Sequence, residues 1–250
     1  MISVCIATYN GGKYIRPQLD SILSQLGEKD EVIISDSRST DDTLDIVRSY
    51  HDPRIRIFDF DNSGIGSGEE AVIMKVKASF LFAISKARGN IVFLSDQDDI
   101  WYENKVDECR RALAAADLVA HSYVAVDNDM NVITQRQLDE NPVFLKTLFQ
   151  NPFQGSCMAF GKKVRDQIVR HSQLLGSARL SHDHVIGYLC WALDGKRRIV
   201  VKNTPLIRYR RHADNVSTTT GKSKYSLKFK ILYRIREILL FIRLKCKKNK

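Results

Sequence analysis

The sequence predicts an α/β fold with a doubly wound, mostly parallel β-sheet flanked by helices. Strand-like and helix-like segments alternate through the first half of the chain, which is typical of parallel sheets with helices on both faces. A short apolar run, residues 91–94, then leads directly into Asp96, Asp98 and Asp99. A buried strand brings such residues to the carboxyl edge of the sheet, where α/β proteins bind ligands. The 250 residues, 44% of them hydrophobic, suffice for one sizeable core.

The elements of the first half follow from residue type and spacing. Short β-branched or apolar runs predict strands at residues 3–8, 32–35, 55–58 and 91–94. Helical spacing and capping residues predict helices at residues 14–26, from Ser39 or Thr40 to residue 50, and at residues 75–86. Residues 9–12 form a turn and residues 62–68 a glycine-rich loop.

The second half is less regular. Strands are expected at residues 118–126, at the end of 153–160 and at 198–201, with a hairpin that returns through residues 132–133. Helices are expected at residues 142–148 and 184–193.

The formal net charge of +10 is carried entirely by the C-terminal segment. Residues 222–250 hold eleven Lys and Arg against the single acid Glu237, so residues 1–221 are neutral. We therefore expect a main domain, 1–221, and a basic tail, 222–250. A nucleic-acid-binding enzyme is usually basic across its working face, so no nucleic-acid partner is expected.

The tail has the pattern of a basic amphipathic helix. Leu227, Ile231, Ile235, Ile238 and Ile242 fall on one helical stripe, with Lys and Arg beside it. Such helices lie on anionic membrane surfaces, where each basic residue adds about 1 kcal/mol. The alternatives are a helix docked on the main domain and a helix that binds a partner protein.

The cysteines and the N-terminus bear on location. The five cysteines are scattered, odd in number and without metal-ligand spacing, which favours reduced thiols in the cytosol. The first residues lack the basic leader and long apolar region of a signal peptide, and no stretch approaches the length of a transmembrane helix.

The three carboxylates of residues 96–99 predict a cation site. They repel one another unless a cation lies among them, and hard divalent ions bind carboxylates together with substrate phosphates. The alternative is a solvated acidic turn that caps the next helix.

Five motifs in this order resemble those of the family-two inverting glycosyltransferases of GT-A fold, in the bacterial polysaccharide branch often labelled rhamnosyltransferase-like. The motifs are residues 3–10 with 18–25, residues 36–43, residues 96–101, His182-Asp183, and residues 209–215. The resemblance covers roughly residues 1–217.

The resemblance implies a nucleotide site at the sheet edge. Thr8, Tyr9 and Asn10 would bind the base, Asp36 would accept a hydrogen bond from a base N–H, and Asp96 would contact the ribose. A turn formed by Tyr9 and Asn10, and a helix cap at Asp36, are the alternatives.

The resemblance also implies a metal that holds the diphosphate. Asp98 would coordinate it and His212 would complete its shell; imidazole suits Mn²⁺ better than Mg²⁺, and either ion is expected. Arg210 or Arg211 would bind the diphosphate through the guanidinium fork. The alternative for His212 is a solvated loop histidine.

By the same resemblance, Asp183 is the general base that takes the proton of the acceptor hydroxyl, although it could also cap the following helix. Gly155, Ser156 and Trp101 would line the acceptor side. Two departures from the family pattern stand out: Arg38 replaces a usual glycine, and Ser79 replaces an asparagine before Phe80.

The resemblance implies a metal-dependent, inverting glycosyltransferase of hexosyltransferase type. Its donor would be a nucleotide-diphospho-sugar, of UDP or dTDP, and its acceptor a polyprenyl-diphosphate-linked surface glycan at the inner face of the cell membrane: O-antigen, capsule or exopolysaccharide. One rival is a sugar-nucleotidyltransferase, which would have Arg and Lys in a glycine-rich loop after the first strand, where this chain has Tyr-Asn-Gly-Gly-Lys. The other is a catalytically silent nucleotide-binding module.

Overall fold

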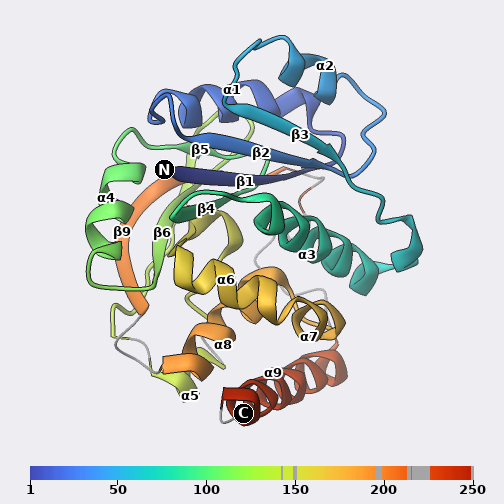
Figure 1. Cartoon of the computed structure of the whole chain (residues 1–250), viewed down its shortest axis with the longest axis vertical. Coiled ribbons are helices and arrows are strands. Elements are labelled where there is room, and N and C mark those ends of the chain that lie inside the picture. Colours follow the sequence, from blue (N-terminus) through green and yellow to red (C-terminus); the bar gives the residue numbers. More distant parts are fainter. Residues whose placement is uncertain (142, 149–150, 195–198, 213–214, 216–225, 249–250) are drawn as a thin grey trace.

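A computed structural model describes the chain apart from residues 142, 149–150, 195–198, 213–214, 216–225 and 249–250 (Figure 1). Its described strands form one sheet in the order β3-β2-β1-β4-β8-β6-β9-β5, and β7 pairs with β6. Figure 1 shows helices on both faces of this sheet. The predicted α/β class is therefore confirmed.

The first four strands are parallel, as the alternation of elements predicts. They are β1 (Ile2–Thr8), β2 (Glu31–Asp36), β3 (Ile55–Asp59) and β4 (Ile91–Ser95). In their register Thr8 lies beside Asp36, and Ile6 lies beside Ser95. The residues that follow β1, β2 and β4 therefore meet at one edge of the sheet.

The direction changes at β8 (Met158–Gly161), which runs antiparallel to both β4 and β6 (Leu118–Val126). Strand β9 (Ile199–Arg210) is parallel to β6 and continues well past the predicted end at residue 201; Arg198 lies outside the described residues. Two short antiparallel strands complete the sheet, β5 (Ile100–Trp101) and β7 (Val132–Gln135). The expected hairpin is the β6–β7 pair.

The sheet has a hydrophobic core on each face. Along β1, Val4 and Ile6 enter one core and Cys5 enters the other, as the alternation of side chains in a strand requires. The first core packs against α1 (Gly12–Leu23), α2 (Thr43–Arg48) and α4 (Lys105–Leu113). The second packs against α3 (Glu69–Lys86), α6 (Lys162–Arg170), α7 (Ser172–Ser177) and α8 (His182–Asp194). The short helix α5 spans Phe144–Thr147, and 3-10 turns span Ser63–Ile65 and Gly155–Cys157.

The starts of α2 and α3 differ most from the prediction. Helix α2 begins at Thr43 without a side-chain cap, because the Ser39 hydroxyl donates to Asp36 instead. Helix α3 begins at Glu69, six residues before the predicted start, and Gly68 precedes it with φ of +94°. Pro142, at the predicted start of a helix, lies outside the described residues.

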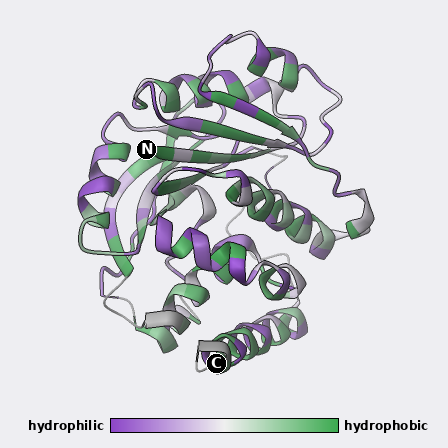
Figure 2. Ribbon diagram, viewed as in Figure 1, coloured by the Kyte–Doolittle hydropathy of each residue, from purple (hydrophilic) through white to green (hydrophobic). Residues whose placement is uncertain are grey.

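The tail forms α9 (Leu227–Lys248), which packs against α8 as the outermost helix (Figure 1). Its buried face carries Glu237, Leu240 and Leu244, whereas the predicted apolar stripe is 41–74% exposed. Figure 2 shows hydrophilic and hydrophobic residues alternating along this helix. The helix thus docks on the domain through the positions outside the predicted stripe. No described helix is long and apolar enough to cross a bilayer, and the predicted boundary at residues 221 and 222 lies outside the described part.

A glycine in α8 makes the helix sensitive to one added methyl group. A Cβ at Gly187 would lie 2.3 Å from the ring of Phe153, which is buried. We expect Gly187→Ala to lower the free energy of unfolding by about 1–3 kcal/mol because of this overpacking. In the control Gly176→Ala, nothing lies within 4 Å of the added carbon, so stability stays the same or rises slightly. Urea denaturation of both variants measures the difference; equal stabilities would contradict the prediction.

Candidate active site

Asp36 is held rigidly at the end of β2. One oxygen of its carboxylate accepts hydrogen bonds from Thr8 Oγ1 at 2.8 Å and Ser39 Oγ at 2.6 Å, and the other accepts the backbone N–H of Ser39 at 2.8 Å. The side chain is buried. An ionised carboxylate has about four acceptor positions, so one remains for a ligand N–H.

The loop after β1 presents an exposed aromatic ring. Tyr9 is 60% exposed, while its backbone N–H donates to Gln97 Oε1 at 2.9 Å and its carbonyl accepts from Gln97 Nε2 at 3.1 Å. Asn10, with φ of +48°, accepts the backbone N–H of Thr40 at 2.8 Å through its side-chain oxygen. The Tyr9 ring is thus fixed at its backbone and open on its face, which suits stacking on a base. Gln97 was missed by the sequence analysis, although it lies inside the acidic motif.

Arg38 lies in a backbone conformation that favours glycine. It has φ of +61°, the left-handed conformation that glycine adopts most easily. Its guanidinium pairs with Asp61 at 3.0 Å on the surface.

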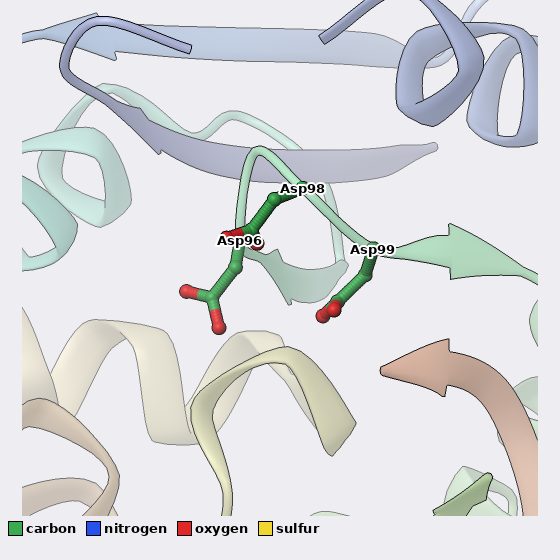
Figure 3. Close-up of side chains that lie close together, drawn as sticks. All are labelled: Asp96, Asp98 and Asp99. Atoms are coloured by element: carbon green, nitrogen blue, oxygen red, sulfur yellow. The ribbon is translucent and has the colours of Figure 1, made fainter. Parts of the chain in front are cut away.

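Figure 3 shows Asp96, Asp98 and Asp99 on the loop between β4 and β5. Each offers an oxygen within 4.8 Å of the others. Burial, and then the charge of Asp98, raise the pKa of Asp96 to about 7 and hold the pKa of Asp99 well above its usual range. Asp99 is fully buried and accepts the backbone N–H of Arg210 at 3.2 Å, so it does not cap the next helix. A divalent cation among these carboxylates would offset their mutual repulsion and the cost of burying them.

His212 and Asp98, the two predicted metal ligands, lie together. His212 Nε2 is 2.8 Å from Asp98 Oδ2, and the Asn215 side-chain amide donates to the same oxygen at 3.2 Å. Tyr14 stacks on the imidazole with ring centres 4.5 Å apart. The set of carboxylate oxygens and one imidazole nitrogen fits Mn²⁺, and Mg²⁺ less well.

Arg210 and Arg211 differ in burial and in contacts. Arg210 is buried: its Nε donates to the carbonyl of Asp98 at 3.0 Å, and its guanidinium lies over the ring of Tyr14. It therefore holds the acidic loop in place. Arg211 lies with its guanidinium over the ring of Tyr209, half-buried.

The three residues expected on the acceptor side are buried. Trp101 is only 3% exposed, packs against Phe93 and lies under the Lys105 ammonium, so it offers almost no surface to an acceptor. Gly155 and Ser156 are buried as well. Gly155 leaves room for the ring of His182, because a Cβ at this position would lie 2.0 Å from His182 Nε2. The Ser156 carbonyl accepts from Lys105.

Lys105 is a functional candidate that the sequence did not suggest. It is fully buried, its ammonium donates to the Ser156 carbonyl at 2.7 Å, and burial lowers its pKa to about 8. The charges of Asp99 and Asp96 oppose that decrease, so the lysine lies within their field. It is a buried positive charge beside the acidic loop.

Asp183 lies in the first turn of α8, and its charge contributes to the raised pKa of Asp96. The candidate base therefore lies near enough to the acidic loop for its charge to act on Asp96. Burial alone would raise the pKa of Asp183, but the charge and hydrogen bonds of His184 hold it below its usual range. Asp183 is thus an ionised carboxylate, as a proton acceptor must be.

A family model described as Glycosyl transferase family 2 matches residues 3–165, more than half of the chain. The chain belongs to this family. "Putative glycosyltransferase EpsH" of Bacillus subtilis (strain 168) is 29% identical over 231 residues, which cover 86% of this chain and 62% of that protein. Chondroitin synthase of Pasteurella multocida (strain Pm70) is 30% identical over 130 residues, 51% of this chain and 12% of that protein. The chain spans less than two thirds of these relatives.

Several solved structures share the fold. S. aureus TarS 1-349 in complex with UDP-GlcNAc has a TM-score of 0.66 at 17% identity, covering 99% of this chain and 71% of that chain. Glucosyl-3-phosphoglycerate synthase from Mycobacterium tuberculosis, in complex with Mn²⁺, UDP and phosphoglyceric acid, has a TM-score of 0.54 at 16% identity, with coverages of 98% and 78%. The expected GT-A fold is confirmed.

We expect Mn²⁺ to stabilise the protein more at about pH 8 than at about pH 6. Because the pKa of Asp96 is raised in the folded state, its protonation stabilises the fold fully below the unfolded-state pKa, and that contribution is lost as the pH rises to about 7. Above that pH the cation replaces the proton. Thermal unfolding at both pH values, with and without Mn²⁺, measures the stabilisation by the ion.

The matched variant is Asp98→Asn, which keeps the size of the side chain and removes a charge from the cluster. Without metal it should unfold at the same or a higher temperature, because like-charge repulsion falls. With Mn²⁺ the stabilisation should be lost. An equal Mn²⁺ effect in both proteins would place the ion elsewhere.

Proposed function

We propose that this glycosyltransferase transfers a sugar with inversion, from a nucleotide-diphospho donor held by a divalent cation. The observation that carries the proposal is the placement of an ionised carboxylate, Asp183, within the field of the acidic loop. One carboxylate that accepts a proton and a separate cation site are the two parts that a single inverting displacement needs.

Each residue has a step in this reaction. Asp183 takes the proton of the acceptor hydroxyl as that oxygen attacks the anomeric carbon of the donor. Asp98 and His212, with Asp96 beside them, would hold Mn²⁺ or Mg²⁺, which stabilises the charge that grows on the departing diphosphate. Arg210 keeps their loop in position through the Asp98 carbonyl.

The base site suits uracil or thymine. The Tyr9 ring is exposed for stacking, and the free acceptor position of Asp36 matches an imide N–H. UDP and dTDP donors are therefore proposed, and TarS, whose structure contains UDP-GlcNAc, has the same fold. A sugar-nucleotidyltransferase is disfavoured because the loop after β1 has the sequence Tyr-Asn-Gly-Gly-Lys, whereas such an enzyme would have Arg and Lys in a glycine-rich loop there.

The proposed acceptor is a polyprenyl-diphosphate-linked glycan at the cytoplasmic face of the membrane. Its support is the outer face of α9, where Leu227, Ile231 and Ile235 are exposed among lysines and arginines. Apolar side chains flanked by basic ones fit the boundary of an anionic bilayer. This contact would bring the site close to a lipid-anchored substrate.

The nucleotide site is tested by thermal unfolding with UDP, dTDP, GDP and CMP, each with and without Mn²⁺. We expect UDP or dTDP to stabilise only with metal, and Asp183→Asn to keep this stabilisation while donor turnover falls about 10²–10⁴-fold. Retained turnover in Asp183→Asn would assign the base to another group. No stabilisation by any nucleotide would favour the catalytically silent module.

The membrane contact is tested with phosphatidylglycerol vesicles. We expect the triple variant Ile231→Ser, Ile235→Ser, Ile238→Ser to lose at least about tenfold in vesicle affinity, because less apolar surface is buried. Val132→Ser with Ile133→Ser on β7 is the control, since both side chains are at least as exposed but lie outside the basic helix. Binding that survives the triple variant, or deletion of residues 222–250, would contradict the proposal.

A further inference from the structure

The face of α9 that packs against α8 places a buried acid, Glu237, beside the first turn of α8. Glu237 is fully buried, and its Oε1 lies 3.1 Å from His184 Nε2. Both of its oxygens also accept hydrogen bonds from Arg234 Nη1, at 2.9 and 2.8 Å. Leu240 and Leu244 on the same face are apolar. Burying a carboxylate costs several kcal/mol before its partners compensate, so packing alone does not account for Glu237.

His184 lies between this acid and the proposed base. Its backbone N–H donates to Asp183 Oδ1 at 2.9 Å, and its ring Nδ1 lies 3.3 Å from the same oxygen. The same Nδ1 is 2.6 Å from Ser181 Oγ. The imidazole therefore has a carboxylate on each side, one from α8 and one from α9.

A neighbouring amide determines which ring nitrogen of His184 carries the proton. Asn151 accepts the backbone N–H of Phe153 through its Oδ1, so its Nδ2 donor faces His184 Nε2 at 2.9 Å. A neutral His184 accepts there and has its proton on Nδ1; a charged His184 donates from Nε2 to Glu237 instead. In both states Nδ1–H points towards Ser181 and Asp183.

Tyr233 gives α9 a second contact with the same turn. Its hydroxyl accepts the backbone N–H of Ser181 at 2.9 Å and lies 3.0 Å from Ser181 Oγ. Two side chains of α9, one turn apart, thus fix the residues on either side of Asp183.

We propose that Glu237 and His184 are positioning residues for Asp183, so that α9, when docked on α8, completes the site of the catalytic base. Glu237 orients the imidazole, and the imidazole holds one oxygen of the Asp183 carboxylate in place. The inference rests on the proposed role of Asp183 and adds a residue from the tail to the active site.

The test compares Glu237→Gln, which keeps shape and removes charge, with Glu237→Asp and with the control Arg236→Gln. Arg236 anchors α9 to Glu70 at 2.6 Å, away from His184, so its loss weakens docking alone. The full chain is labelled with ¹³C at aspartate carboxyls and ¹⁵N in histidine rings. The Asp183 and His184 signals are assigned by their loss in Asp183→Asn and His184→Gln.

In Glu237→Gln we expect the Asp183 carboxyl signal to move in the same direction as in His184→Gln, and the ring signals of His184 to move as the imidazole loses a facing carboxylate. In Arg236→Gln both signals stay at their wild-type positions. An unchanged Asp183 signal in Glu237→Gln would overturn the proposal, whatever the stability of the variant.

Turnover provides a second readout, with UDP-N-acetylglucosamine and the other nucleotide sugars of the bases that stabilise the protein. We expect kcat to fall about tenfold in Glu237→Gln with KM for the donor unchanged, and Glu237→Asp to recover part of it. Unchanged kcat would also overturn the proposal. A wild-type protein that turns over no donor would instead contradict the proposed function, and the carboxyl signal would still decide the role of Glu237.

Discussion

The repulsion among Asp96, Asp98 and Asp99 is the constraint on which the surrounding structure depends. Three carboxylates within 4.8 Å at a half-buried sheet edge are unfavourable without positive charge nearby. The chain supplies that charge from distant segments: Arg210 holds the loop from β9, and buried Lys105 lies beside it from α4. Burial and the charge of Asp98 still raise the pKa of Asp96, and a cation among the three carboxylates would offset their charge.

The strand directions bring these groups to one edge of the sheet. Strand β8 is antiparallel to both β4 and β6, so β6 and its parallel partner β9 run in the same direction as β4 and end at its carboxyl edge. His212 therefore reaches Asp98 across 114 positions of sequence. The site lies where the sheet changes topology, as ligand sites in open α/β sheets generally do.

Local patterns predicted the parallel strands and the sheet edge, because β-branched runs and the acids after residue 94 are short-range signals. Lys105 could not be found in this way, since a lysine at a helix start has the pattern of a solvated charge. The inner face of α9 was missed for a similar reason. Leu240 and Phe241 lie outside the apolar stripe that the sequence predicts, yet the helix docks through them, because tertiary packing decides which face of an amphipathic helix is buried.

The two faces of α9 have different surroundings, which the composition of the tail does not reveal. A helix that only covered the core would bury its broad isoleucine stripe, and a helix that only bound membrane would leave its acid exposed to water. In this chain the stripe stays outside, and the single acid of the segment is buried against His184. Whatever displaces α9 from α8 therefore separates Glu237 from the turn that carries Asp183. The position of this helix and the geometry of the proposed base are thus coupled through the buried contact between Glu237 and His184.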